Sequence, residues 1–398
     1  MTTVEPKGPQ TFEYHPRAGV APLMSWFERI DSLIAAAPYH YSTAAQGFAM
    51  LTSLEGIRDV MQHPDAFSNS SVDPTEPNPP YLWIPEMLDP PVHTKWRQLL
   101  APYFSPARIA DMEEGVRALA RKLVDEIAPK GRCDFTADFA GVYPIQIFLE
   151  LMGLPVEDAP RFLVWEDHIL NPDPETDPDQ SRSYQAMQDV MAYFSELFER
   201  RRAEPADDLV SAALSWRIDG EPIPDADLLS MCLLMFMAGL DTVTAQLSWT
   251  YYHLAANPSD RERLVRDPAL IPDAVEESLR FYTIVTPSRK VMRDTVVAGC
   301  PLKPGEMVYL PLAAACRDPQ GFHDADQFIL DRSPNNHIAF GAGAHRCVGS
   351  HLARRELRVA LEEWHKRIPV YRIAEGTEPA TRLGGQRTCI DLVLTWDV

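Results

Sequence analysis

The segment that decides the fold is residues 340–349, which read Phe-Gly-Ala-Gly-Ala-His-Arg-Cys-Val-Gly. It lies between a short apolar stretch and a helix predicted over 348–366. Loop glycines let the backbone approach a bulky group closely, and the N–H groups and dipole of a helix N-terminus stabilise a thiolate. A stabilised thiolate at Cys347 with open space above it is the ligand that a soft or borderline metal ion requires.

Three other interpretations of this segment are open on the residues alone. The two loop glycines precede a helix, as in a dinucleotide-binding loop, but the third glycine falls at Gly349 and breaks that spacing. His345, Cys347 and His351 could hold zinc, although no second cluster supplies a fourth ligand at a familiar spacing. Cys347 could also be a small buried cysteine at the start of a helix.

The composition is that of a soluble globular protein, with 45% apolar and 24% charged residues in 398. The net charge of −20 argues against a nucleic-acid binder, because phosphate backbones require a basic surface. The six cysteines form no CxxC pair, which argues against a disulfide framework. The N-terminus has no signal-peptide core, and the apolar run 228–240 is shorter than a membrane span of ~20 residues. We therefore expect a cytoplasmic protein without a membrane partner.

Hydrophobic periodicity predicts a mostly helical protein with a minor sheet portion. The predicted helices cover 53–64, 109–131, 143–153, 160–170, 181–203, 225–256, 270–282 and 348–366. Short strands are predicted within 39–51, near 285–297 and at 390–396. Because no internal repeat or flexible linker marks a boundary, we expect a single domain over 1–398, with 1–20 as an irregular N-terminal arm.

The segment 340–349 resembles the haem-binding loop of the cytochrome P-450 family, the haem-thiolate monooxygenases, whose pattern is FGxGxHxCxG. Every fixed position of the pattern is met, by Phe340, Gly341, Gly343, His345, Cys347 and Gly349. The resemblance implies the family's single-domain fold, a triangular helical prism with haem b between the long central helix and the helix after the cysteine. It also implies that Cys347 is the axial ligand of the haem iron and that O2 is a co-substrate, since thiolate ligation favours O–O cleavage.

Glu277-Ser-Leu-Arg280 resembles the ExxR pair of the family, which joins an arginine before the cysteine loop, here Arg332, to brace the core on the haem side. Pairs at this spacing are usually solvated helix contacts worth ~0.2–0.5 kcal/mol. Position relative to Cys347 distinguishes Glu277 and Arg280 from the other Glu-x-x-Arg spacings. Those others stand at 55/58, 114/117 and 199/202.

In the long apolar helix, residues 238–242 (Ala-Gly-Leu-Asp-Thr) resemble the family's oxygen-binding motif. Gly239 costs about 0.5–1 kcal/mol relative to alanine within a helix, and a buried Asp241 costs more without partners, so both indicate function. We predict Asp241 and Thr242 as the catalytic pair that orients water and delivers protons. Helical spacing places both residues on one face with Leu234.

The resemblance also assigns residues to the haem itself. His93 and Arg97, four apart on one helical face, join Arg289 and His345 as the predicted partners of the haem propionates. Arginine pairs with carboxylates in a bidentate, charge-assisted manner that suits a buried carboxylate. The other predicted cofactor-binding residues are Ala238, Gly239, Phe340, Gly341 and Gly349.

Residues 81–91 and the Gly-Leu-Asp-Thr-Val stretch look closest to the bacterial camphor-hydroxylase branch of soluble enzymes. By position, the resemblance implies a substrate pocket of Tyr81, Trp83, Leu234, Met237, Ala238, Val285, Thr286 and Leu383. This set is apolar with one phenol and one hydroxyl, so we expect a small hydrophobic substrate such as a terpenoid, steered by one hydrogen bond. That branch usually has an acidic residue two before Arg289, where this chain has Pro287.

The haem domain takes up the whole chain, so the resemblance implies an external electron donor, an iron–sulfur ferredoxin served by a NAD(P)H-dependent ferredoxin reductase. Residues 335–360 carry a local net charge of +3 in a chain of −20. We predict Arg346, Arg354 and Arg355 as the patch that attracts an acidic ferredoxin.

The sequence thus predicts a monooxygenase that inserts one oxygen atom of O2 into its substrate. Two alternatives remain open. The first is a haem-thiolate binding or sensor protein without turnover, which would not consume reducing equivalents in response to substrate. The second is a haem-thiolate isomerase or dehydratase, which would work without a ferredoxin.

Overall fold

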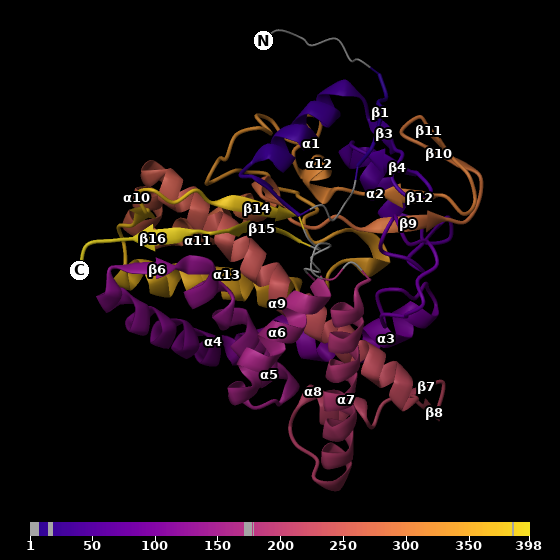
Figure 1. Cartoon of the computed structure of the whole chain (residues 1–398), viewed down its shortest axis with the longest axis horizontal. Helices are drawn as coiled ribbons and strands as arrows, with labels where there is room; N and C mark the ends of the chain where they lie inside the picture. Colours follow the sequence, from indigo (N-terminus) through magenta and orange to yellow (C-terminus); the bar gives the residue numbers. More distant parts are fainter. Residues whose placement is uncertain (1–7, 15–18, 171–176, 178, 384–385) are drawn as a thin grey trace.

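The computed structural model describes residues 8–14, 19–170, 177, 179–383 and 386–398 (Figure 1). Its α-helices are α1 (Ser25–Ala36), α2 (Leu54–Gln62), α3 (Val92–Leu100), α4 (Pro106–Ile127), α5 (Val142–Met152), α6 (Ala159–Leu170), α7 (Ser181–Ala203), α8 (Leu209–Ala213), α9 (Asp225–Ala256), α10 (Pro258–Arg266), α11 (Ile271–Phe281), α12 (Leu312–Cys316) and α13 (Ser350–Arg367). Most of the long helices occupy the lower and left parts of Figure 1, whereas α1, α2 and α12 lie above them, where most strands also lie.

The strands are short. They are β1 (Thr11–Phe12), β2 (Val20–Pro22), β3 (Tyr39–Ser42), β4 (Phe48–Leu51), β5 (Phe67–Ser68), β6 (Arg132–Asp134), β7 (Arg217–Ile218), β8 (Glu221–Pro222), β9 (Ser288–Val291), β10 (Thr295–Val297), β11 (Cys300–Leu302), β12 (Met307–Tyr309), β13 (Arg372–Ile373), β14 (Ala380–Leu383), β15 (Arg387–Ile390) and β16 (Val393–Thr395). The largest sheet has the order β1-β3-β4-β12-β9-β5, in which β12 runs parallel to β4 and antiparallel to β9.

The core is organised around α9, which crosses the centre of the molecule in Figure 1 and contacts α5, α6, α7, α10, α11 and α13. Most of its second half is buried, with Trp249 and Tyr251 both at 0% exposure. The Trp249 indole stacks on Tyr282, which directly follows α11, with ring centroids 5.1 Å apart. This burial of large aromatic surface fixes α9 against the helices that carry the rest of the site.

Among the described residues, α9 is the one helix that is long and apolar enough to cross a membrane. More than half of its most apolar window is buried against the rest of the protein, 56% in all. A helix that is apolar on nearly every side is expected to lie inside a core. The observed packing therefore makes α9 a helix of the protein core.

The prediction of a mostly helical protein with a minor sheet portion is confirmed, and the helices predicted at 181–203 and 225–256 match α7 and α9 residue for residue. The expectation of an irregular arm over 1–20 is wrong in its described part, because Thr11–Phe12 pairs parallel with β3. Aromatic packing explains this strand. Tyr14 lies against Tyr309 with ring centroids 5.7 Å apart and accepts a hydrogen bond from the Trp26 indole at 3.0 Å.

Candidate functional site

The cysteine loop is held in a tight conformation between α2 and α13. Gly343 has a φ of 68°, and a Cβ atom at this position would collide with the backbone oxygen of Met61 in α2, so only glycine fits. The backbone N–H of Cys347 donates to the carbonyl oxygen of Phe340 at 2.9 Å, which closes the loop just before α13 begins at Ser350.

Cys347 differs from the other five cysteines, all of which are buried, because it is exposed within the cavity that it lines. Desolvation raises the pKa of the Cys347 thiol, whereas the backbone N–H of Gly349 and the guanidinium groups of Arg97 and Arg346 lower it. Because desolvation is the largest of these effects and the charge of Glu86 adds to it, the pKa of the Cys347 thiol is raised overall, and the protein groups alone do not give the expected thiolate stabilisation. In the described part of the chain, no group of three or more His, Cys, Asp and Glu side chains could hold a metal ion, which argues against the zinc interpretation.

A cavity of about 420 Å³ lies next to Cys347. Most of its wall is apolar and comes from α9, α5, the loop before β9 and the cysteine loop. The predicted residues that line it are Trp83, Arg97, Leu234, Met237, Ala238, Gly239, Thr242, Val285, Thr286, Arg289, Phe340, Gly341, His345, Cys347 and Gly349. Residues far apart in the sequence thus converge on one site, as the resemblance implied.

Two predicted pocket residues are not among the residues that line this cavity, Tyr81 and Leu383. The Tyr81 hydroxyl donates to a Glu76 carboxylate oxygen at 3.0 Å, and its ring stacks on Trp83 with centroids 4.9 Å apart. Thr286 lines the cavity, but its hydroxyl accepts from the Arg387 guanidinium at 3.0 Å. The phenol and the hydroxyl expected to steer a substrate are therefore both engaged by protein groups.

The four predicted propionate partners lie together. The imidazoles of His93 and His345 have ring centroids 3.9 Å apart, and burial lowers the pKa of His93 to about 4 and that of His345 to about 2, so both are neutral. His93 Nδ1 and His345 Nε2 are buried without a hydrogen-bond partner. Arg97 and Arg289 line the cavity beside them. Two guanidinium groups and two imidazole nitrogens that need partners suit the two carboxylates of haem b.

A carboxyl that the sequence analysis did not identify lies among these cations. Glu86 lines the cavity, and its Oε1 accepts from the Asn69 amide at 3.0 Å. The same Asn69 nitrogen is 3.0 Å from His345 Nδ1. Desolvation raises the pKa of Glu86, and the charges of Arg289 and Arg97 lower it. The signal in the sequence was an isolated glutamate in the apolar stretch 82–88.

Most residues of the oxygen motif in α9 line the cavity. These are Ala238, Gly239 and Thr242, and a Cβ on Gly239 would approach the Phe148 ring to 2.9 Å. The Thr242 hydroxyl donates to the Ala238 carbonyl at 2.9 Å.

Asp241 is 7% exposed and is not among the residues that line the cavity. It lies one turn after Met237 and two turns after Leu234, which both line the cavity, so the helical repeat keeps it on their face.

Asp241 belongs to a cluster of charged residues from three elements. Desolvation raises its pKa to about 6, with Arg382 of β14 lowering it and Asp167 of α6 raising it. Arg382 lies 3.9 Å from the Asp167 carboxylate. Glu166, which precedes Asp167 on α6 and was not predicted, is 9% exposed, and burial followed by the Asp241 charge raises its pKa well above the usual value. Two buried carboxyls therefore adjoin behind the cavity wall.

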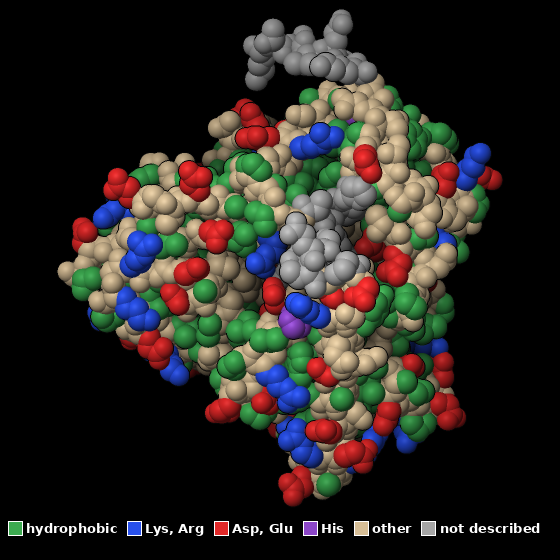
Figure 2. Space-filling view, viewed as in Figure 1, with side chains coloured by type: hydrophobic (Ala, Val, Ile, Leu, Met, Phe, Trp, Pro, Cys, Tyr) green, Lys and Arg blue, Asp and Glu red, His purple; other side chains and the backbone are tan. Residues whose placement is uncertain are grey.

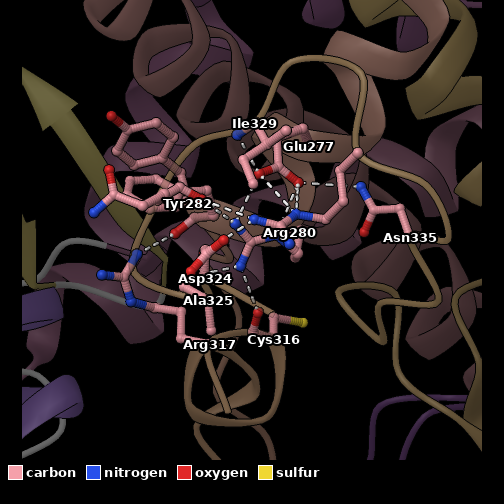
Figure 3. Close-up of polar contacts among 12 residues, drawn as sticks. Glu277, Arg280, Tyr282, Cys316, Arg317, Asp324, Ala325, Ile329 and Asn335 are labelled. Carbon is pink, nitrogen blue, oxygen red and sulfur yellow. Dashed lines mark hydrogen bonds and ion pairs between the residues drawn. The ribbon is translucent and has the colours of Figure 1, made fainter. Parts of the chain in front are cut away.

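The predicted Glu277, Arg280 and Arg332 network is formed and fully buried (Figure 3). Arg280 donates to both Glu277 oxygens, at 2.8 and 2.7 Å, and Arg332 Nε lies 3.0 Å from Glu277 Oε2. The two guanidinium groups also donate to backbone carbonyls of the segment that leads to the cysteine loop, at Cys316, His323, Asp324, Ala325 and Gln327. One carboxylate and two cations thus fix the backbone of that segment.

The predicted redox patch is largely neutralised by residues outside 335–360. Arg354 donates to both carboxylate oxygens of Glu276, at 2.6 and 2.8 Å, and Arg355 pairs with Glu113. Arg346 is exposed. The net charge counted over residues 335–360 did not include Glu113 of α4 and Glu276 of α11, which lie outside that range. The positive charge of the patch is therefore weaker than predicted.

Comparisons with known proteins agree with this geometry. The family model described as Cytochrome P450 matches residues 168–269 and 266–364. "Probable cytochrome P450 127A1" of Sinorhizobium fredii is 34% identical to this chain, covering 90% of it and 87% of that protein. "Steroid C26-monooxygenase" of Mycolicibacterium smegmatis is 31% identical and covers 83% and 82%. The solved structure of CYP101J2 superposes with a TM-score of 0.87 at 31% identity, covering 98% of this chain and 97% of that one.

Proposed function

The chain belongs to the cytochrome P450 family, and from this premise we propose that it hydroxylates a small hydrophobic substrate, such as a terpenoid, in the cytoplasm. The overall reaction consumes the substrate, O2, two electrons and two protons, and it yields the hydroxylated product and water. The observation that carries the proposal is the placement of Cys347, exposed in an apolar cavity opposite Thr242 and beside paired guanidinium and imidazole groups. When bound, haem b supplies the activation of O2.

The residues of this chain have separate tasks in the proposed reaction. Cys347 would hold the iron, while the imidazoles and guanidinium groups of the propionate cluster would hold the haem carboxylates. Ala238 and Gly239 keep the cavity open above the haem because neither has a long side chain. The Thr242 hydroxyl, at the cavity wall, would turn from the Ala238 carbonyl to donate a hydrogen bond to O2, and Asp241, the preceding residue of the helix, would resupply the proton.

We expect Asp241→Asn to lower the rate of product formation roughly 100-fold, because an amide cannot carry the proton. The same change is expected to stabilise the fold at pH 7.5. A pKa of about 6 means that the native state holds this proton more tightly than the unfolded chain, so stability falls as pH rises toward 6 and stays low above it. Asn lacks this charge, and the free energy of unfolding should rise by about 2–3 kcal/mol at pH 7.5.

The measurements are the rate of product formation, and urea unfolding at pH 4 and pH 7.5. The matched control is Asp227→Asn, because Asp227 lies in the first turn of the same helix and outside the cavity. That variant should keep wild-type turnover and differ by less than about 1 kcal/mol at either pH. If Asp241→Asn turned over substrate as fast as the wild type, Asp241 would not be the proton carrier.

We further propose that the electrons come from an iron–sulfur ferredoxin that docks over Arg346, reduced in turn by a NAD(P)H-dependent reductase. The exposed Arg346 side chain follows directly on the haem-side imidazole of His345 and precedes Cys347, so a partner bound there would lie close to the iron. Figure 2 shows acidic and basic side chains interspersed over the face that it displays. On such a mixed surface, one exposed cation can orient an acidic partner protein as it docks.

We expect Arg346→Ala to lower the second-order rate constant of reduction by a ferredoxin about 3- to 10-fold at low ionic strength, with the difference disappearing at high salt. Stopped-flow reduction measures this. The substitution keeps the bond between Arg97 and the backbone oxygen of residue 346, which is 2.7 Å long. Arg372→Ala, at a 64% exposed side chain on β13, is the control and should leave the rate unchanged. Equal rates in both variants would rule out docking over Arg346.

A further inference from the structure

The carboxyl of Glu86 lines the same cavity as the guanidinium groups of Arg97 and Arg289. Glu86 is remote from both in the sequence, in the loop between β5 and α3. The charge of Arg289 acts on it more strongly than that of any other cation, followed by the charge of Arg97. The fold therefore adds one carboxyl to the wall that holds the predicted propionate partners.

The position of Glu86 is fixed by hydrogen bonds on both its backbone and its side chain. The amide nitrogen of Asn69 donates to the Glu86 carbonyl oxygen at 2.8 Å and to the Oε1 atom at 3.0 Å. Asn69 is itself completely buried, and its backbone N–H donates to Asp89 at 2.9 Å. Because this amide also lies 3.0 Å from His345 Nδ1, Glu86 and the cysteine loop share one anchor.

The charges around Glu86 come from four elements. Asp89 follows Glu86 in the same loop, and Arg289 lies on β9. The helix α3 carries Arg97 and the neutral His93. The cysteine loop carries the neutral His345 together with Arg346 and Cys347. Haem b would add two carboxylates to this group. The buried guanidinium of Arg289 and the half-buried one of Arg97 would then face at least three carboxyls, and like charges so close together in a largely dry site cannot all ionise.

We propose that Glu86 is a haem-contacting residue, which shares a proton with a haem carboxylate and so couples the charge of the propionate cluster to the iron. This inference rests on the proposed haem-thiolate function. A shared proton forms a charge-assisted hydrogen bond between Glu86 and the haem carboxylate, with Asn69 holding the other Glu86 oxygen. Loss of the proton at higher pH adds a negative charge near the iron, which favours the oxidised form.

The test is the midpoint potential of the haem-loaded protein, measured between pH 5 and pH 9 by spectroelectrochemistry. In the wild type we expect the potential to fall as pH rises. Glu86→Gln keeps hydrogen-bonding groups but has no proton to lose. The midpoint potential of this variant should therefore not change with pH between pH 5 and pH 9, and at pH 9 it should lie above that of the wild type. Glu76→Gln, in the same loop but not on the cavity wall, is the matched control and should retain the wild-type slope.

A second measurement covers the case in which Glu86→Gln loads haem poorly. Glu86→Ala removes the contact altogether, and we expect haem to transfer to an excess of apomyoglobin at least about 5-fold faster than from the wild type. The proposal would be overturned if the midpoint potential changed with pH equally in Glu86→Gln and the wild type. It would also be overturned if Glu86→Ala and the wild type lost haem to apomyoglobin at equal rates. The spectrum of the reduced carbon monoxide complex tests thiolate ligation separately, so failure of the proposed function would be recognised independently.

Discussion

Replacing Cys347 by serine is expected to abolish product formation and to remove the strongly red-shifted Soret band of the reduced carbon monoxide complex. The reason is electronic, because a hydroxyl does not supply the charge that a thiolate gives to the iron. Cys347 is also the only one of the six cysteines, all of them described, that is exposed and lines the cavity. No other thiol is therefore placed to substitute for it.

The matched control for this variant is Cys300→Ser. Cys300 is buried in β11, and its sulfur lies 3.6 Å from the Tyr41 hydroxyl, so a serine hydroxyl can keep the contact. We expect this variant to retain both the red-shifted band and turnover. A red-shifted band in freshly purified, haem-supplemented Cys347→Ser would show that another ligand holds the iron and would contradict the assignment.

Replacing Glu277 by glutamine is expected to produce the largest loss of stability, about 3–5 kcal/mol in the free energy of unfolding. The substitution preserves shape but leaves Arg280 and Arg332 without their shared carboxylate in a site where all three side chains are at most 1% exposed. Because these guanidinium groups also hold the backbone that leads to the cysteine loop, haem loading should fall as well. Chemical denaturation and the haem-to-protein ratio measure the two effects.

An exposed pair at the same spacing provides the control. Glu199 and Arg202 on α7 are 2.9 Å apart, with side chains 76% and 43% exposed. Glu199→Gln should change the free energy of unfolding by less than about 0.5 kcal/mol, because water screens and replaces an exposed ion pair. If the two glutamine variants were equally stable, the Glu277 network would not brace the core.

Local patterns predicted the helices well because their apolar periodicity coincides with burial. The helix α7 follows a heptad-like spacing of Ala186, Val190, Tyr193 and Leu197, all of which are buried. The spacing of His93 and Arg97 implied a helical turn, but periodicity did not predict the full length of α3, because it follows a proline-rich loop and has only three buried residues. β1 was missed because two residues carry no period, and tertiary contacts of Phe12 and Tyr14 determine it.

The candidate site was predictable where a motif is contiguous and less so where it is assembled in space. The loop glycines, Cys347 and the Glu277 network follow from short patterns. Glu86, Glu166 and the acids that pair with Arg354 and Arg355 come from other elements, and no spacing in the chain relates them. The burial of Asp241 beside Glu166 and Arg382 could not be predicted for a similar reason, because α6 and β14 supply these neighbours.

One face of α9 carries both the cavity wall and Asp241, and this bears on how the enzyme could change over evolution. Leu234 and Met237 line the apolar wall, and Asp241 lies two turns and one turn after them on the same face. Substitutions that adapt the wall to a new molecule therefore also change the neighbours of Asp241. Selectivity and proton supply are expected to diversify together, because a single helix face carries both.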